Sequence, residues 1–248
     1  MSSVQRELAE RLALVRERIE VAASRGGRRT KQIVLVAVSK THSPRRICEL
    51  HEAGVRHFGE NRVQERESKL ARVAGLDATW HMIGHLQKNK AARATGLFDS
   101  IDSLDSVALA QKLDRARSEV MMEESGKRAL ATAGGRLRVL VEVKLDPEPA
   151  KSGAESKDVP RLVEAIMHLP HLELRGLMGV PPYFDDPEET RPYFRALREL
   201  RDAVQKQMRE EMLPVLSMGM SHDFEIAIEE GATEIRVGTA LFGERETA

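Results

Sequence analysis

A lysine stands at the exit of the most strand-like stretch of the chain. Residues 33–40, IVLVAVSK, form an apolar run rich in valine, a pattern typical of a strand buried on both faces. Such strands belong to parallel sheets covered by helices, and in those folds the carboxyl ends of the strands carry the chemistry. An isolated lysine at a strand end can also simply extend to water. Lys40 therefore needs partners before it indicates a site.

Two turns later in the chain could hold a phosphate group. Residues 217–221, SMGMS, and 237–239, VGT, place glycines and hydroxyl groups after two further predicted strands. Barrels commonly build a phosphate site at such positions from backbone amides and a short helix N-terminus, and Ser221 is predicted to begin that helix. Glycine and serine are also ordinary turn residues. The occurrence of both motifs on neighbouring strands favours the phosphate interpretation.

Arg236 adds a cation to the same region. It lies between Ile235 and Val237 in the last predicted strand, so its side chain points to the opposite face, into the end of the barrel. A strand-end lysine, a phosphate cradle and an inward arginine together suggest pyridoxal 5′-phosphate (PLP), with Lys40 as the imine and Arg236 facing the ring nitrogen. A Schiff-base aldolase acting on a phosphorylated sugar is the competing chemistry.

Other polar residues are expected at the same face because they end or follow predicted strands: Asn61, His81 and Lys144. His81 and His85 have the spacing of two metal ligands, but Gly84 places them on different local geometries, so a metal site is not expected. The sequence contains no Walker loop, GxGxxG fingerprint or GxSxG elbow.

Eight predicted strands bring these residues together, and each of the first seven is followed by a helical pattern. The strands are predicted at residues 33–40, 55–59, 79–84, 97–102, 137–145, 172–180, 213–220 and 233–243, the last range including the exit loop of the strand. The alternation, in about the length of a (β/α)8 TIM barrel, predicts an α/β fold with one domain spanning residues 1–248. A doubly wound open sheet shows the same alternation and stays open as an alternative.

Two further segments have no place in this alternation. Residues 3–24 predict a helix with an apolar stripe, which packing on its own barrel explains as well as dimerisation does, so a monomer or weak dimer is expected. Residues 121–135 carry no strong period and are interpreted as a surface loop or a frayed helix extension.

Composition excludes several classes of protein. Lysine plus arginine and aspartate plus glutamate each total 39, so the formal net charge is zero and nucleic acid is not an expected partner. Cys48 is the only cysteine, which rules out an internal disulfide. The charged N-terminal residues and the lack of a long apolar run argue against a secretory signal and against a membrane span. A cytoplasmic protein is expected.

Seven motifs in this order resemble those of the YggS/PROSC family, also called pyridoxal phosphate homeostasis proteins: AVSKTHS, HFGENRVQE, WHMIGHLQKNK, AKSG, GLMGV, LSMGMSHDFEIAI and IRVGTALFG. The resemblance covers residues 33–243. It implies the fold of the N-terminal barrel of bacterial alanine racemase, a fold-type III PLP barrel. Residues 121–135 are longer than the family usually has there.

The resemblance also implies a role for each matching residue. Lys40 would carry the covalent imine with PLP, and Arg236 would face the pyridine nitrogen. The remaining residues would hold the phosphate or lie beside the cofactor: Ser221, Gly238 and Thr239 for the phosphate, and Asn61, Met218, Gly219 and Met220 around the ring.

The sequence favours a carrier over an enzyme. Arginine keeps its proton, so it limits the electron-sink power of the cofactor. A racemase needs a second acid/base, which alanine racemases take from a C-terminal domain of the partner subunit, and here the chain ends soon after the eighth strand. We expect a non-catalytic protein without metal ligands that supplies PLP to apoenzymes, with effects on vitamin B6 and amino-acid balance. The alternatives are a PLP-dependent enzyme of amino-acid racemase type and a scaffold without ligand.

Overall fold

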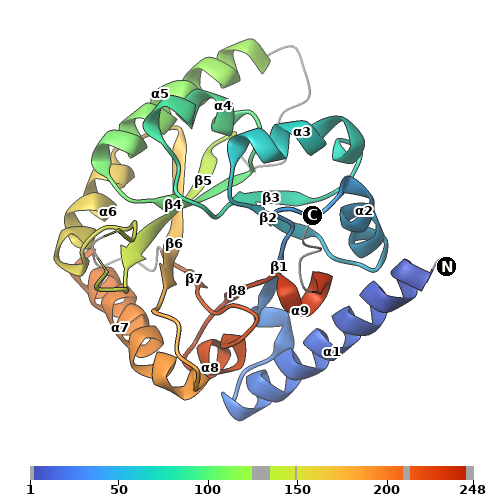
Figure 1. The fold of residues 1–248 in the computed structure, drawn as a ribbon. Coiled ribbons are helices and arrows are strands. Elements are labelled where there is room, and N and C mark those ends of the chain that lie inside the picture. Colours follow the sequence, from blue (N-terminus) through green and yellow to red (C-terminus); the bar gives the residue numbers. More distant parts are fainter. Residues whose placement is uncertain (1–2, 125–134, 149, 209–212, 244–248) are drawn as a thin grey trace.

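The computed structural model describes residues 3–124, 135–148, 150–208 and 213–243. Eight parallel strands pair in chain order and β8 pairs with β1, so the sheet closes into a barrel (Figure 1). The strands are β1 (Val34–Val38), β2 (His57–Glu60), β3 (Thr79–Met82), β4 (Ser100–Leu104), β5 (Leu137–Lys144), β6 (Leu172–Val180), β7 (Val215–Ser217) and β8 (Glu234–Val237). The closed sheet confirms the predicted (β/α)8 TIM barrel and excludes the open sheet.

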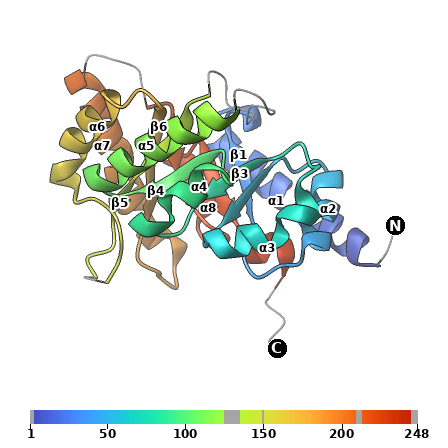
Figure 2. The ribbon, with the colours of Figure 1, turned by 90° about the horizontal axis from the view of Figure 1, so that it is seen from above.

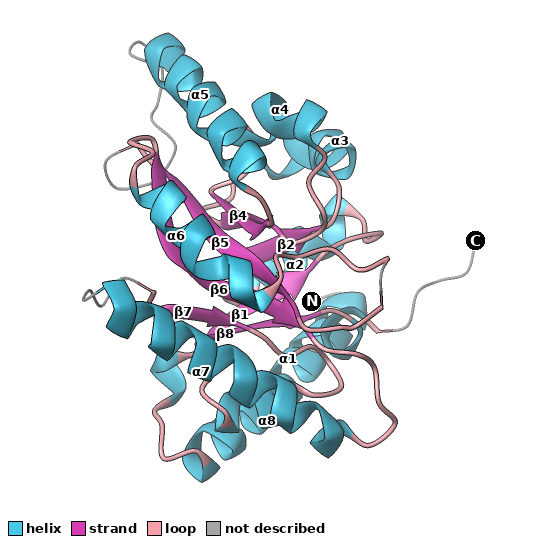
Figure 3. Ribbon diagram, turned by 90° about the vertical axis from the view of Figure 1, so that its left-hand side faces the viewer, coloured by secondary structure: helices cyan, strands magenta, loops and turns pink. Residues whose placement is uncertain are grey.

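Helices surround the strands on the outside of the barrel, as Figure 3 shows from the side. They are α1 (Ser3–Arg25), α2 (Pro44–Glu52), α3 (Val63–Val73), α4 (Ala91–Thr95), α5 (Val107–Glu124), α6 (Val159–Met167), α7 (Arg191–Met208), α8 (Phe224–Glu229) and α9 (Thr239–Phe242). Short 3-10 turns add η1 (Thr30–Gln32), η2 (Lys88–Lys90), η3 (Ser156–Asp158) and η4 (Pro187–Thr190). Within the described ranges, no helix combines the length and apolar character that a membrane crossing requires.

Helix α1 buries its apolar stripe against its own barrel. Leu8, Leu12, Val15 and Ile19 are all less than 5% exposed. The helix contacts α2, α8 and α9, and it lies beside the last elements of the chain in Figures 1 and 2. Arg18 adds an ion pair to Glu225 of α8, with 2.6 Å between Nε and Oε1. Intramolecular packing is therefore sufficient to explain the stripe.

The fourth strand begins three residues later than predicted and ends two residues later. Leu97 and Phe98 belong to the turn after α4, where the Phe98 N–H donates to the Ala94 carbonyl at 3.1 Å and the Phe98 ring is buried. The strand is the polar segment SIDSL, and all five of its residues are buried. The predicted segment 97–102 therefore overlaps the strand at residues 100–102 only, because Leu97 and Phe98 belong to the turn and the strand continues through the buried Ser103 to Leu104.

The predicted start of the helix after β7 was also wrong. Ser221 does not begin a helix, because the Met220 N–H donates to the Asp223 side chain at 2.6 Å and closes a turn, so α8 begins only at Phe224. In the segment 233–243, predicted as the eighth strand with its exit loop, the strand ends at Val237 and the exit segment forms the short helix α9. In the region around 121–135, α5 continues to Glu124, and residues 125–134 lie outside the described part.

Replacement of Gly176 by alanine is expected to destabilise the barrel by roughly 3 kcal/mol. A Cβ at this position would lie 1.9 Å from the Val215 carbonyl oxygen on the paired strand, so the backbone of β6 or β7 would have to move. Gly75→Ala is the matched control, because nothing lies within 4 Å of its added Cβ. Urea unfolding of both variants checks this, and equal midpoints would contradict it.

Candidate functional site

Three adjacent strands bring the main predicted residues to one face of the barrel. Strand β8 pairs with β1 on one side and with β7 on the other. Lys40 lies just after β1, Ser221 lies in the turn after β7, and Gly238 directly follows β8. Because the strands are parallel, these exits share the carboxyl-terminal face, where barrels place their sites. Lys40 is half-buried there.

The turn after β7 and the start of α9 form a cradle around the Ser221 hydroxyl. Its Oγ accepts the N–H groups of Gly238 at 3.1 Å and Ala240 at 3.3 Å. Thr239, between them, has an exposed side chain. A hydroxyl with neighbouring backbone amides is the kind of donor set that suits a phosphate group. The structure therefore brings together the predicted phosphate residues, although Ser221 contributes from a turn rather than from a helix.

The three residues before Ser221 differ in what they can contribute. Met218 is fully buried in the hydrophobic core, whereas the side chain of Met220 is 37% exposed. Gly219 has a φ of +91°, and a Cβ there would lie 2.6 Å from the Cβ of Ala227, so both backbone conformation and space require glycine. This glycine lets the turn pass closely over α8.

Arg236 points into the barrel, as its position in the strand predicts. It is 3% exposed, and its guanidinium donates to the Ser217 hydroxyl at 2.6 Å and to the Gly179 carbonyl at 3.0 Å. Burial lowers the pKa of Arg236, and the carboxylates of Glu234 and Asp102 oppose that effect. The group stays a cation because an arginine does not lose its proton in proteins.

His81 is the penultimate residue of β3, and its side chain is buried. It sits inside the barrel, where Nδ1 is 2.8 Å from Asp102 Oδ2 and Nε2 is 3.0 Å from His57 Nδ1. Glu234 approaches the same Nδ1 at 3.9 Å. Burial by itself would lower the pKa of His81, but the carboxylates of Asp102 and Glu234 raise it to about 9.

This interior cluster was not foreseen, since it joins residues from β2, β3, β4 and β8. His81, Asp102 and Glu234 each place a potential metal-ligand atom within 4.8 Å of the others. Both ring nitrogens of His81 already make hydrogen bonds, a pattern that fits a protonated imidazole held between carboxylates better than a metal ligand. His85 is separate and exposed, with Nδ1 3.3 Å from Asp105.

The neighbouring His57 should make the protein less stable in acid. Burial, the His81 charge and Arg138 lower the pKa of His57 from 6.5 to about 4. Because the folded-state pKa is the lower one, unfolding takes up a proton between pH 6.5 and 4, and stability falls as the pH falls through that window, by roughly 2 kcal/mol.

A His57→Asn variant tests this contribution, because its amide oxygen can still accept the His81 N–H and it does not titrate. Its unfolding free energy, measured by urea between pH 7 and 4, is expected to fall less steeply than that of the wild type. The exposed His168→Asn variant is the control and should follow the wild-type profile. A His57→Asn profile parallel to the wild type would contradict the assignment.

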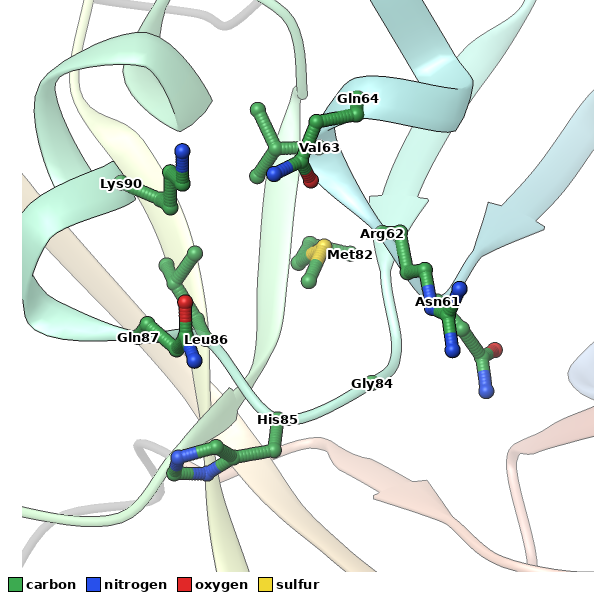
Figure 4. Close-up of a pocket in the computed structure, with 10 residues that line it drawn as sticks. All are labelled: Asn61, Arg62, Val63, Gln64, Met82, Gly84, His85, Leu86, Gln87 and Lys90. Atoms are coloured by element: carbon green, nitrogen blue, oxygen red, sulfur yellow. The ribbon is translucent and has the colours of Figure 1, made fainter.

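Asn61 lies beside a cavity at the exits of β2 and β3 (Figure 4). The cavity has a volume of about 640 Å³, and polar or cationic side chains on its wall include Arg62, Gln64, Gln87 and Lys90. The Oδ1 atom of Asn61 is buried and has no hydrogen-bond partner among the described residues. Such an orphaned acceptor is costly, so a bound group that donates to it would stabilise the site.

Lys144, the other predicted strand-end lysine, is not part of the three-strand group. It ends β5, which pairs with neither β8 nor β1, and its Nζ lies 3.6 Å from Glu155 Oε1. An ionic group that the sequence analysis does not identify lies next to Lys40. It consists of Glu60, Glu65 and Lys69, and it contacts the residues on either side of Lys40. One feature of the sequence could have indicated it, because Lys69 lies on the buried face of α3 with Val63 and Val73.

Comparison with known proteins agrees with the geometry. The profile of the family described as alanine racemase, N-terminal domain, matches residues 11–246. The pyridoxal phosphate homeostasis protein of Aquifex aeolicus is 44% identical over 238 residues, which cover 96% of this chain and 98% of the relative. The protein of the same name from Escherichia coli K12 is 36% identical over 244 residues, 97% of each chain.

Solved structures of related proteins resemble the chain over nearly its whole length. PipY of Synechococcus elongatus PCC7942, solved with PLP bound, is 39% identical with a TM-score of 0.80 and covers 95% of this chain and 100% of its own. An alanine racemase of Clostridium difficile 630 shares the fold alone, with 14% identity and a TM-score of 0.66 over 96% of this chain and 56% of the racemase. The chain belongs to the alanine racemase N-terminal domain family and, within it, to the YggS/PROSC family of pyridoxal phosphate homeostasis proteins.

Proposed function

We propose that this protein holds PLP reversibly as an imine at Lys40 and takes part in intracellular PLP homeostasis and cofactor supply, with an effect on amino-acid balance. The observation that carries the proposal is the meeting of Lys40, the Ser221 cradle and Arg236 at the ends of three adjacent strands. The names of the relatives and the PLP bound to PipY support it.

The residues at this face fit PLP in donor chemistry. PLP supplies an aldehyde that condenses with a lysine amine, with loss of one water molecule, and hydrolysis reverses the link. Lys40 would provide the amine, and the Ser221 hydroxyl with the turn amides at Gly238 and Thr239 would hold the phosphate. The orphaned Asn61 oxygen would gain a partner beside the cofactor. Gly219 and the exposed Met220 would line the pocket, with Met218 packed in the core behind them.

The position of Arg236 favours storage of PLP over catalysis on an amino-acid substrate. Its guanidinium is fixed by Ser217 and the Gly179 carbonyl and is proposed to face the pyridine nitrogen. A donor that keeps its own proton leaves that nitrogen unprotonated, and an unprotonated ring withdraws electrons from the substrate Cα weakly. The site is therefore better suited to storing the cofactor than to proton abstraction.

The test of the imine is to add PLP to the purified protein, reduce the mixture with borohydride and map the modified peptide by mass spectrometry. Reduction converts the C=N bond to a stable amine and so marks the lysine that reacted. We expect a visible absorption band before reduction and the label on Lys40. Label distributed over surface lysines, or none at all, would overturn the proposal.

Proton exchange at Cα separates a carrier from an enzyme of racemase type. The PLP-loaded protein is mixed with a panel of L-amino acids in heavy water, and NMR follows the α-proton signal. A persistent signal with an intact absorption band supports the carrier. Loss of the signal faster than with free PLP would replace the carrier proposal with the racemase-type one.

Cofactor supply is tested with a PLP-dependent apoenzyme and a phosphatase that destroys free PLP. The loaded protein is expected to restore the apoenzyme activity under conditions in which the same amount of free PLP does not. Equal failure of the two sources would show that the protein does not deliver its PLP to that apoenzyme, and would contradict cofactor supply by this route.

A further inference from the structure

Lys40 is one of the two central residues of a tight turn. The His42 N–H donates to the Ser39 carbonyl at 3.1 Å and closes the turn over Lys40 and Thr41. Thr41 has a φ of +67°, and it is the one non-glycine residue in the left-handed region within the described ranges. This conformation is costly for a β-branched residue, so the surrounding structure must hold it.

The ion pair between Glu65 and Lys69 of α3 forms hydrogen bonds with the turn on both sides of Lys40. On the C-terminal side, Glu65 Oε1 accepts the Thr41 N–H in a short hydrogen bond. On the N-terminal side, Lys69 Nζ donates to the Ser39 carbonyl at 2.9 Å. Glu65 and Lys69 are joined to each other at 2.8 Å, one helical turn apart.

The pair is anchored in the core rather than at the surface. Lys69 is 5% exposed and also donates to Glu60 Oε1 at 2.8 Å, and this carboxylate accepts the Ser39 hydroxyl at 2.6 Å. Past the turn, the His42 ring stacks on Phe242 of α9, with 4.2 Å between centroids. The turn is thereby tied to α3, to the end of β2 and to the helix that follows the phosphate cradle.

We propose that Glu65 and Lys69 are positioning residues that hold the strained Lys40–Thr41 turn and so aim the Lys40 amine at the PLP aldehyde. The proposal rests on the proposed function, because it concerns the same lysine. A lysine on an unrestrained turn samples many directions, and misplacement of a reacting group by about 1 Å can cost roughly a hundredfold in rate.

A Glu65→Ala variant tests the role. The equilibrium constant and the rate of imine formation, followed by absorbance, are expected to fall by roughly tenfold or more, with a smaller fraction of Lys40 trapped by borohydride. Glu67→Ala is the matched control, since Glu67 lies on the same helix but pairs with the exposed Arg93. Glu65→Ala values equal to those of Glu67→Ala would overturn the proposal.

Restoration of imine formation by a substitution at Thr41 would distinguish a positioning role of Glu65 from a role in the stability of the fold. Glycine adopts a positive φ without strain, so Thr41→Gly in the Glu65→Ala background should restore imine formation to within about threefold of Thr41→Gly alone. A double variant as weak as Glu65→Ala would overturn the positioning role, because loss of a merely structural ion pair is not repaired at Thr41.

Two further measurements cover the cases in which Glu65→Ala does not fold or the wild type forms no imine. If Glu65→Ala does not fold, Glu65→Gln retains an oxygen for the Thr41 N–H and should form the imine as the wild type does, whereas Glu65→Leu should not; equal behaviour of these two folded variants would overturn the proposal. Failure of the wild type itself to form an imine would instead reject the proposed function.

Discussion

A Lys40→Ala variant is expected to lose the visible absorption of the PLP imine and to retain PLP roughly a hundredfold less tightly than the wild type. The methyl side chain cannot condense with an aldehyde, so only the phosphate cradle and Arg236 would remain to hold the cofactor. Absorbance spectra and equilibrium dialysis with PLP give the two readouts. An unchanged spectrum would reject Lys40 as the imine residue.

Lys144→Ala is the matched control for this prediction. Lys144 is the other lysine at a strand end, but it ends β5 and pairs with Glu155 at 3.6 Å. Its loss should leave both the spectrum and the retention of PLP unchanged. Equal losses in the two variants would show that a general effect of lysine removal, rather than the position of Lys40, produces the result.

An Asp102→Asn variant is expected to lose about 3 to 5 kcal/mol of stability near neutral pH, because it leaves the buried His81 imidazolium without its main partner. Asp102 is fully buried, so water cannot replace the lost charge. Urea unfolding measures the change. Asp105→Asn is the control, since its partner His85 is 55% exposed, and it should cost less than about 1 kcal/mol.

The sign of the pH dependence follows from the pKa of His81, about 9 in the folded protein against an ordinary value of 6.5. The stabilisation by Asp102 is fully present below pH 6.5 and is lost as the pH rises toward 9. The difference between wild type and Asp102→Asn should therefore shrink over this window. A difference that stays constant between pH 6 and 9 would contradict the assignment of the charge to His81.

Local patterns were enough to predict the architecture and the strand-end residues. Few folds accommodate strands that are buried on both faces and alternate with helices. Arg236 points inward because side chains alternate between the two faces of a strand. The start of the polar strand β4 was misplaced, because its buried polar groups find partners on another strand or loop. Asp102 pairs with His81 of β3, and the Ser103 hydroxyl donates to the Gly84 carbonyl, contacts that form only after the barrel has closed. No local rule on hydrophobicity identifies such a strand.

The hydrogen bonds from Glu65 and Lys69 to the turn that contains Lys40 could not be predicted for a related reason. Glu65 and Lys69 lie four residues apart on a helix, a spacing that is also typical of ordinary surface ion pairs. Only the closed structure brings them to the Thr41 N–H and the Ser39 carbonyl, 24 and 30 positions earlier in the chain. The interior cluster likewise joins His81 to Glu234, far away in sequence. Contacts at such separation depend on topology and register, which periodicity does not specify.

The packing of α1 also constrains how the protein can be made. A ribosome releases α1 well before two of its partners, α8 and α9, which lie at the other end of the described fold. Until then the leucine and isoleucine stripe of α1 lacks those two partners, and the sheet lacks the β8 that joins β1 to β7. The barrel therefore cannot close before β8 has been synthesised, and until then the nascent chain exposes apolar surface that chaperones can bind.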